Sequence, residues 1–255
     1  MRALYVLIGD PVAHSRSPAI HARAFQLLGV DAVYAPCRVT DVPGAVRALR
    51  SLGIAGANVT IPHKQAVIPS LDRLEETARR IGAVNCIASR DGVLHGHNTD
   101  REGILRALGS FSGRAVVLGA GGSARAAVDA LRPQVTIVNR TRSRGEELAR
   151  EMGVEAGGPE ALARAEVVVN CTSVGMSGEE MPIDPAALRG TPTIIDLAYS
   201  PRGETALIRA ARAKGLRTID GIDVLVQQAI ASLEIWLERP RLGELAVELR
   251  KAALA

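Results

Sequence analysis

The sequence predicts an α/β protein made of two α/β domains, and three observations support this fold class. Short apolar stretches that are typical of strands alternate with helical stretches along a chain of 255 residues. A glycine-rich turn near the middle, between a buried strand and a helix, has the form of a dinucleotide-binding fingerprint. Two helical stretches with no later strand close the chain. We therefore expect a first domain with a mostly parallel sheet, a Rossmann-type second domain, and C-terminal helices that pack back on the first.

The first half of the chain is predicted to alternate strands and helices. Strands are expected near residues 3–9, 33–39, 56–61, 84–89 and 93–96, and helices near 17–28, 42–52 and 72–81. Ser17 followed by Pro18 predicts how the first helix begins, with serine as the N-cap and proline at the first helical position. The closing helices are expected near 222–237 and 242–253, on either side of Pro240.

The second domain is predicted to start with a helix near 101–109. Further strands are expected near 114–118, 135–139, 167–170, 193–197 and 216–219, with helices that end near 131 and that cover 204–214. The turn Gly119-Ala120-Gly121-Gly122-Ser123-Ala124 follows the first of these strands. Gly119 permits a tight turn, Gly121 lets the backbone approach a pyrophosphate, and the next helix attracts the anion at its N-terminus. A glycine-rich turn without a ligand is the alternative.

The end of the second strand of this domain indicates which dinucleotide binds. Folds that bind NAD place an acidic residue there to hold the ribose hydroxyls, whereas this chain has Asn139-Arg140-Thr141, with Arg144 close behind. A guanidinium group and a hydroxyl suit a 2′-phosphate, so NADP(H) is the expected cofactor. The same residues would also serve to begin a helix, with Ser143 and Glu146 as a capping box.

Composition and charge exclude several classes of protein. Hydrophobic residues make up 47% and charged residues 23% of the chain, as in ordinary globular domains. The net charge is +4 and no basic run is interleaved with aromatic residues, so nucleic acid is not an expected partner. No run of 18 apolar residues occurs, so no membrane span is expected. Three separated cysteines without metal-ligand spacing, Cys37, Cys86 and Cys171, predict reduced thiols, no metal and a cytoplasmic protein.

A lysine after the strand near 56–61 is the main candidate for chemistry. Pro62 ends that strand, so Asn58, Thr60 and Lys64 are expected at the rim of the sheet, where open α/β sheets bind ligands. The chain has 31 basic residues, of which only three are lysines. Lysine, unlike arginine, releases its proton when desolvated, so its presence here suggests proton transfer. Chance is the alternative explanation.

A second polar group lies just before the helix that opens the second domain. Asp100 has a structural alternative, because Thr99 and Glu102 would form a capping box with Asp100 in the first turn. Ser15 and Ser17 have capping explanations as well. As a set with the lysine, these residues supply what the oxidation of an alcohol needs: a proton carrier, its carboxylate partner, hydroxyls for an anionic substrate, and a nicotinamide site for hydride.

The chain resembles the shikimate dehydrogenase family from about Leu7 to Trp236. The following stretches carry the resemblance: His14-Ser15-Arg16-Ser17-Pro18, Asn58 to Lys64, Gly82-Ala83-Val84-Asn85, Asn98-Thr99-Asp100 with Gly103, Gly119 to Ala124, Asn139-Arg140-Thr141, Asn170 to Met176, Asp196 with Tyr199 and Pro201, and Gly221 with Gln227-Gln228. Members reversibly reduce 3-dehydroshikimate to shikimate with NADPH, on the pathway to chorismate and aromatic amino acids. The resemblance implies that residues 1–101 with 221–255 bind the substrate, that 102–220 bind NADP, and that the enzyme is a monomer or homodimer.

The resemblance also implies roles for single residues. Lys64 would be the general acid and base, paired with Asp100. The substrate would be held by Ser15, Ser17, Thr60, Asn85, Asp100, Tyr199 and Gln228. The cofactor would be held by Gly119, Ala120, Gly121, Gly122, Ser123, Asn139, Arg140, Thr141 and Arg144, with Leu197 and Gly221 near the nicotinamide and Glu76 near the cofactor. The chain departs from the family at Val224, where methionine is usual, and we expect a modest loss of cofactor affinity.

Three alternatives stay open at this level. A quinate/shikimate dehydrogenase would prefer NAD or accept quinate, and Arg140 argues only against the NAD preference. A methylenetetrahydrofolate dehydrogenase has a related two-domain plan, but Ser15 and Ser17 suit a small carboxylate better than a pteridine. A non-catalytic ligand sensor would not need both Lys64 and Asp100.

Overall fold

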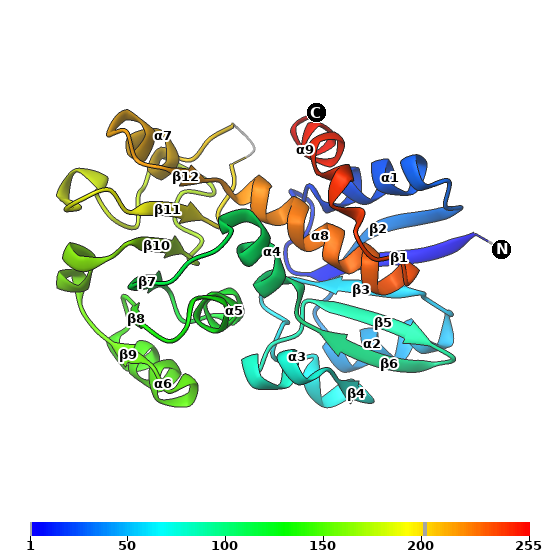
Figure 1. Cartoon of the computed structure of the whole chain (residues 1–255). Helices are drawn as coiled ribbons and strands as arrows, with labels where there is room; N and C mark the ends of the chain where they lie inside the picture. The colour runs from blue at the N-terminus through cyan, green and yellow to red at the C-terminus, as the bar shows by residue number, and fades with distance from the viewer. Residues whose placement is uncertain (1, 201–202) are drawn as a thin grey trace. The chain divides into compact units, whose positions relative to one another are not determined.

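The computed structural model describes residues 2–200 and 203–255, and within them the chain forms two six-stranded sheets (Figure 1). It divides into two compact units: a first unit of Met1–Gly103 with Val226–Ala255, and a second unit of Ile104–Leu225. The predicted fold class is confirmed, since both units are α/β and their sheets are mostly parallel. Pro201, one residue of the resemblance, lies outside the described residues. None of the described helices is both long and apolar enough to cross a membrane.

The sheet of the first unit has the strand order β2-β1-β3-β5-β6-β4. Its strands are β1 (Ala3–Gly9), β2 (Ala32–Arg38), β3 (Gly56–Val59), β4 (Arg73–Leu74), β5 (Cys86–Arg90) and β6 (Val93–His97). β1 pairs in parallel with β2 and β3, whereas β5 runs antiparallel to β3 and β6. Asp91 and Gly92 join β5 to β6, and both have the positive φ that a tight hairpin turn requires.

Helices from both ends of the chain cover the first unit. They are α1 (Ser17–Leu28), α2 (Val42–Ser51), η1 (Ile68–Ser70), α3 (Glu76–Ile81), η4 (Leu242–Leu245) and α9 (Ala246–Leu254), together with parts of α4 (Thr99–Leu108) and α8 (Gly221–Leu237), which cross the boundary between units. α9 lies beside α1, where Arg23 and Glu248 form an ion pair at 2.9 Å (Figure 1). The C-terminal helices therefore pack on the first unit, as predicted.

The sheet of the second unit is parallel throughout, with the order β12-β11-β10-β7-β8-β9. Its elements are β7 (Ala115–Leu118), α5 (Gly122–Leu131), β8 (Val135–Val138), α6 (Arg142–Met152), β9 (Glu155–Ala156), η2 (Pro159–Arg164), β10 (Val167–Asn170), η3 (Pro185–Ala187), β11 (Thr193–Asp196), α7 (Ala206–Ala213) and β12 (Thr218–Ile219). Val117 of β7 packs into one apolar core and Val116 into another. Both faces of the sheet are thus covered, which explains why its strands are continuous apolar runs.

The predicted helix near 72–81 is wrong in its first part. Residues Arg73–Leu74 form β4, which pairs in parallel with β6, and α3 begins only at Glu76. The Asp72 carboxylate accepts hydrogen bonds from the backbone N of Leu94 and from Arg50, both at 2.7 Å. These contacts with distant residues hold the segment at the edge of the sheet, and local periodicity does not reveal them. The strand predicted over 56–61 also ends earlier, at Val59.

One predicted helix start and two capping alternatives differ from the structure in detail. α1 begins at Ser17 and its N-cap is Arg16, so Ser17 is not the N-cap. The Ser15 hydroxyl accepts from the backbone N of Ser17 at 3.2 Å. Asn98 caps α4 by accepting from the backbone N of Arg101 at 3.2 Å, which frees the Thr99 side chain for other contacts. α6 begins after Thr141, so the capping box expected from Ser143 does not form.

Candidate active site

The loop that carries Lys64 is fixed at the carboxyl edge of the first sheet. It leaves β3 at Thr60, whose backbone N donates to the carbonyl of Ile8 in β1 at 2.9 Å. The His63 ring contacts the carbonyl of Val39 through Nε2 at 2.7 Å. The carbonyl of Lys64 accepts from the backbone N of Val84 at 2.8 Å. Contacts with β1 and with residues beside β2 and β5 thus hold this loop, so the Lys64 side chain extends from a defined position.

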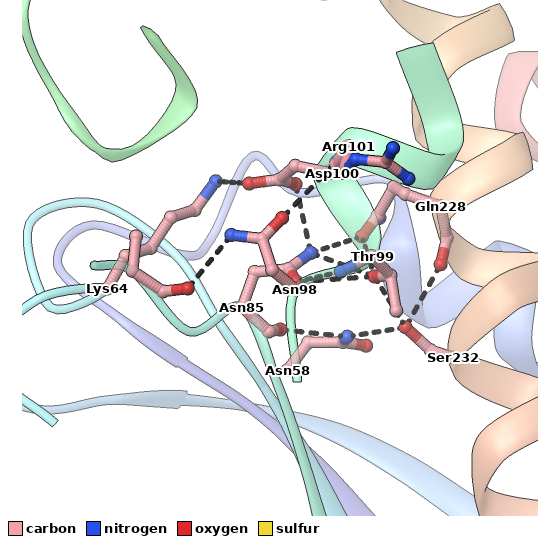
Figure 2. Close-up of polar contacts among 10 residues, drawn as sticks. Asn58, Lys64, Asn85, Asn98, Thr99, Asp100, Arg101, Gln228 and Ser232 are labelled. Carbon is pink, nitrogen blue, oxygen red and sulfur yellow. Dashed lines mark hydrogen bonds and ion pairs between the residues drawn. The ribbon is translucent and has the colours of Figure 1, made fainter. Parts of the chain in front are cut away.

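Lys64 and Asp100 form a close ion pair (Figure 2). Nζ of Lys64 lies 2.5 Å from Oδ2 of Asp100, and the two side chains are 12% and 14% exposed. Burial of this degree strengthens the attraction between opposite charges, because little water screens it. The remaining exposure leaves both groups within reach of a bound molecule. This is the pairing that the sequence predicts for proton transfer.

Asn85 donates a hydrogen bond to the second oxygen of the Asp100 carboxylate. Its Nδ2 donates to Oδ1 of Asp100 and to Oε1 of Gln228, each at 2.9 Å (Figure 2). Its Oδ1 accepts from the backbone N of Thr99 at 2.6 Å. Four of the predicted site residues, Lys64, Asn85, Asp100 and Gln228, are therefore joined by direct contacts. Both oxygens of Asp100 have a donor, which fixes the plane of its carboxylate.

A buried polar shell surrounds Asn85, and sequence reasoning missed most of it. The Thr99 hydroxyl lies 3.1 Å from the Ser232 hydroxyl, which accepts from Nδ2 of Asn58 at 3.0 Å (Figure 2). Tyr34 donates its hydroxyl to Oδ1 of Asn58 at 2.8 Å. One signal was present in the sequence, because Ser232 follows Gln228 by four residues and so lies on the same face of its helix.

The serines and the threonine that were assigned to the substrate lie at the same edge of the sheet. Ser15 and Ser17 follow β1, and Thr60 follows β3, its parallel neighbour. Ser15 and Thr60 are partly exposed, whereas Ser17 is buried at the first turn of α1. Hydroxyl groups beside a helix N-terminus suit a carboxylate, because the helix dipole attracts negative charge.

The glycine-rich turn of the second unit fits the pyrophosphate of a dinucleotide. Gly119 has φ of 111°, and an added Cβ there would come within 3.3 Å of Thr172. Gly121 is exposed, and an added Cβ would meet no atom within 4 Å, so the backbone is open at the start of α5. Ala124 is fully buried at the third position of the fingerprint. Ala120, Gly122 and Ser123 complete the turn.

The residues after β8 fit a 2′-phosphate. Arg140, Thr141 and Arg144 are exposed, and Arg140 has no ion-pair partner within the part of the chain that the structure describes. Asn139 supports the turn by donating from Nδ2 to the carbonyl of Thr141 at 2.7 Å. Arg142, in contrast, is paired with Glu146 at 2.8 Å. Glu76 is exposed in the first turn of α3, in the first unit.

Gly221 has a structural reason to be glycine. An added Cβ would lie 2.5 Å from the carbonyl oxygen of Ala198, so only glycine lets α8 begin so close to the end of β11. Leu197 and Tyr199 flank that contact and are partly buried. Val224, one turn into α8, is 6% exposed and packs in the core of the second unit.

A second polar cluster lies at the carboxyl ends of β10 and β11. Asp196 is fully buried and accepts from Nδ2 of Asn170 at 2.8 Å, from the Thr205 hydroxyl at 2.6 Å and from the backbone N of Ala198 at 3.1 Å. Burial raises the pKa of the Asp196 carboxyl above its usual value of 3.8. Among the described residues, no group of three or more histidine, cysteine or acidic side chains is placed to hold a metal ion.

Comparison with known proteins finds relatives along nearly the whole chain. Residues 7–87 match the sequence model of the shikimate dehydrogenase substrate binding domain, and residues 105–224 match that of shikimate / quinate 5-dehydrogenase. The shikimate dehydrogenase (NADP(+)) of Desulfitobacterium hafniense is 39% identical over 253 residues, which cover 92% of each protein.

Solved structures with the same fold include enzymes with two different names. Shikimate 5-dehydrogenase of Thermus thermophilus, in complex with NADP(H) and shikimate, matches with a TM-score of 0.92 and 35% identity, over 99% of this chain and 100% of that one. The 5-ketofructose reductase of Gluconobacter sp. strain CHM43 matches with a TM-score of 0.85 and 31% identity, over 98% of both. Because the fold carries both activities, the substrate has to be argued from site residues.

Proposed function

Because the chain belongs to the shikimate dehydrogenase family, we propose that Lys64 and Asp100 move the proton as this enzyme interconverts 3-dehydroshikimate and shikimate with NADP(H). The enzyme is an oxidoreductase that acts on a CH–OH group. The observation that carries the residue assignment is the 2.5 Å contact between Nζ of Lys64 and Oδ2 of Asp100 at the carboxyl edge of the first sheet.

In the reductive direction Lys64 is the proton donor. When bound, NADPH supplies the hydride to the carbonyl carbon of the substrate. Negative charge then develops on the carbonyl oxygen, and the Lys64 ammonium stabilises that charge and gives the oxygen a proton. In the oxidative direction the neutral amine takes the hydroxyl proton back. Asp100 holds Nζ in place through Oδ2, while Asn85 occupies Oδ1 and keeps the carboxylate from turning.

Substrate binding is assigned mainly to residues of the first unit. Ser15, Ser17 and the N-terminus of α1 would bind the carboxylate, and the resemblance adds Tyr199. Thr60 and Gln228 would hold ring hydroxyls, with Asn85 and Asp100. Quinate has the same carboxylate, so these contacts alone do not exclude it.

Cofactor binding is assigned to the second unit. The backbone from Gly119 to Ser123 would bind the pyrophosphate, since Gly121 leaves room for a ligand. Arg140, Thr141 and Arg144, with Asn139, would bind the 2′-phosphate. Leu197 and Gly221 are proposed near the nicotinamide and Glu76 near the cofactor, on the resemblance alone.

The wider setting follows from the reaction. We propose a substrate domain of residues 1–101 with 221–255 and an NADP domain of 102–220. We also propose a cytoplasmic monomer or homodimer that acts on small molecules and not on nucleic acid. A biosynthetic reaction on a soluble hydroxy acid supports this setting.

A rate assay with two substrates and two cofactors tests the proposal. Shikimate or quinate is offered with NADP or NAD, and formation of the reduced cofactor is followed. We expect turnover with shikimate and NADP well above the other three combinations. Comparable rates with quinate or NAD would show that the carboxylate or 2′-phosphate contacts do not discriminate. A folded protein that binds shikimate and turns over in no combination would be a sensor and not an enzyme.

A further inference from the structure

We propose that the buried hydroxyls of Thr99 and Ser232 are positioning groups, which hold Asp100 toward Lys64 by fixing the direction in which the Asn85 carboxamide faces. This inference rests on the proposed function, since it concerns the pair that moves the proton. Thr99 is 2% exposed and Ser232 is fully buried, so both act through other side chains. Figure 2 shows the two hydroxyls on the side of Asn85 that faces away from Lys64.

The Ser232 hydroxyl has one proton, and the contacts of its oxygen favour one acceptor for it. Its oxygen donates to the carbonyl of Gln228 at 3.0 Å, one turn earlier in α8. The same oxygen accepts from Nδ2 of Asn58 at 3.0 Å. A hydroxyl donates only once, so while Ser232 donates to this carbonyl, Thr99 is the donor in the 3.1 Å contact between the two hydroxyls.

The direction of that contact makes the Thr99 oxygen an acceptor for Asn85, and the Thr99 backbone supports the same orientation of the amide. The Thr99 oxygen, having given its proton to Ser232, lies 2.9 Å from Nδ2 of Asn85 and shares with Oε1 of Gln228 the amide hydrogen that is not donated to Asp100. The backbone N of Thr99 donates to Oδ1 of Asn85 at 2.6 Å. Both contacts require the amide nitrogen to face Oδ1 of Asp100. A flipped amide would place two oxygen acceptors against each other at Asp100 and two donors against each other at Thr99.

Ser232 keeps its position because α8 is anchored on the sheet. Nε1 of Trp236, one turn later, donates to the carbonyl of Ile87 in β5 at 2.9 Å. The indole also lies over Gly56 of β3, where an added Cβ would come within 2.5 Å of Nε1. Asn58 is fixed as well, since Oδ1 accepts from the Tyr34 hydroxyl and Nδ2 must then face Ser232. These contacts therefore fix the positions of Ser232 and Asn58 beside the residues that contact the Asn85 amide.

Loss of the Ser232 hydroxyl releases the Thr99 proton. The Thr99 hydroxyl can then turn to Oδ1 of Asn85 or Oε1 of Gln228, each at 3.3 Å. The backbone N of Thr99 still orients the Asn85 amide, but the amide loses one of the acceptors that held its second hydrogen, so Oδ1 of Asp100 meets its donor less often. A carboxylate that is free to turn aligns Lys64 less often, so we expect kcat to fall about 10-fold while KM for shikimate changes less than about 3-fold.

Five variants in the assay with shikimate and NADP test this inference: Ser232→Ala, Thr99→Val, Thr99→Ser, the double variant Ser232→Ala with Thr99→Val, and Ser51→Ala. Thr99→Val keeps the shape and the backbone donor but removes the hydroxyl, and Thr99→Ser restores the hydroxyl and should recover most of the lost kcat. The double variant should lose about as much as either single one, because the hydroxyls act as a unit. Ser51 is the matched control, since its hydroxyl bonds the Ala48 carbonyl within α2 and is exposed.

The outcomes separate this inference from the proposed function. Unchanged kcat in Thr99→Val and Ser232→Ala, beside active wild type, would overturn the inference alone. So would a Thr99→Ser variant as impaired as Thr99→Val, or losses that follow the melting temperature and appear equally in KM. Wild-type protein without turnover of shikimate would contradict the proposed function instead.

Discussion

Each unit holds an aspartate beside an asparagine and a threonine at the ends of its strands, yet the two carboxylates have opposite surroundings. Asp100 of the first unit lies against the ammonium of Lys64 and keeps 14% of its side chain exposed. Asp196 of the second unit is fully buried, and Asn170, Thr205 and the Ala198 backbone donate to it. These three donors are neutral, and burial raises the pKa of the Asp196 carboxyl.

The difference separates a carboxylate for chemistry from one for architecture. A carboxylate that is paired with a cation and open to a ligand takes part in proton transfer. Asp196 instead connects the end of β11 to Thr205, which caps α7, and to Asn170. Asn170 in turn accepts from the backbone N and the hydroxyl of Thr172, which shapes the loop after β10. Partner charge and exposure distinguish the two aspartates, whereas their neighbouring residue types do not.

The largest expected effect comes from breaking the pair in the first unit. Lys64→Ala should lower kcat by about 10²- to 10⁴-fold with little change in KM, because the lysine acts mainly in the transition state. Lys64→Arg should also lose activity, since arginine keeps the charge but does not release a proton. Steady-state kinetics with shikimate and NADP measure both. A loss shared equally between kcat and KM would give Lys64 a binding role.

The next effect should appear in stability and only in the second unit. Asp196→Ala leaves three buried donors without their acceptor and should lower the free energy of unfolding by about 2–4 kcal/mol. Asp100→Asn, which removes the charge of the aspartate in the first unit but keeps its shape, should lower kcat with a much smaller change in stability. Denaturant unfolding and kinetics on both variants make the comparison. The distinction between the two aspartates would be contradicted if Asp196→Ala is as stable as wild type, or if Asp100→Asn remains fully active.

A third test concerns the cations of the two units. Lys64 is already paired within the protein, whereas Arg140 is exposed and open to an anion. Arg140→Ala should raise KM for NADP about 10- to 100-fold and leave KM for NAD nearly unchanged, because it removes a charged hydrogen bond to the 2′-phosphate. Arg142→Ala is the control, since Arg142 is paired with Glu146. Equal effects of the two variants would point to general attraction by positive charge.

The smallest expected effect is a pH dependence of Asp196. Its pKa is raised on folding, so the unfolded carboxyl ionises first as the pH rises above about 3.8, and the folded state then binds more protons. The stability that protonated Asp196 contributes is full below that pH and falls as the pH rises through the raised pKa. The melting temperature of wild type relative to Asp196→Asn should therefore be highest near pH 4 and decline toward neutral pH. A constant difference would mean that Asp196 stays ionised in the fold.

Features that depend on residues near in sequence were predicted correctly. The alternation of strands and helices gave the α/β class, because the spacing of apolar residues reports the period of each element. Gly119 and Gly121 marked the turn between β7 and α5, where Gly119 has the positive φ that glycine adopts most easily and an added Cβ at Gly121 would meet no atom within 4 Å. Lys64 and Asp100 are 36 positions apart, and their chemistry and the resemblance, not local spacing, indicated the pair that the structure places 2.5 Å apart.

Features that depend on contacts between residues far apart in the sequence were not predicted correctly. Arg73–Leu74 became a strand because Asp72 is held by Arg50 and by Leu94 across the sheet. Thr99 was interpreted as part of a cap, but its hydroxyl faces Asn85 and Ser232 inside the first unit.

The sequence by itself therefore determined the fold class and the glycine-rich turn, because residue type and local spacing specify them, and the chemistry of Lys64 and Asp100 with the resemblance indicated the charged pair. Only the tertiary structure decided how that pair is held. Asn58 and Ser232 are 174 positions apart in the chain, and their hydrogen bond exists only because α8 packs against β3 and β5. A buried hydrogen bond takes its geometry from the elements that carry its donor and acceptor, and no local pattern records which elements will meet.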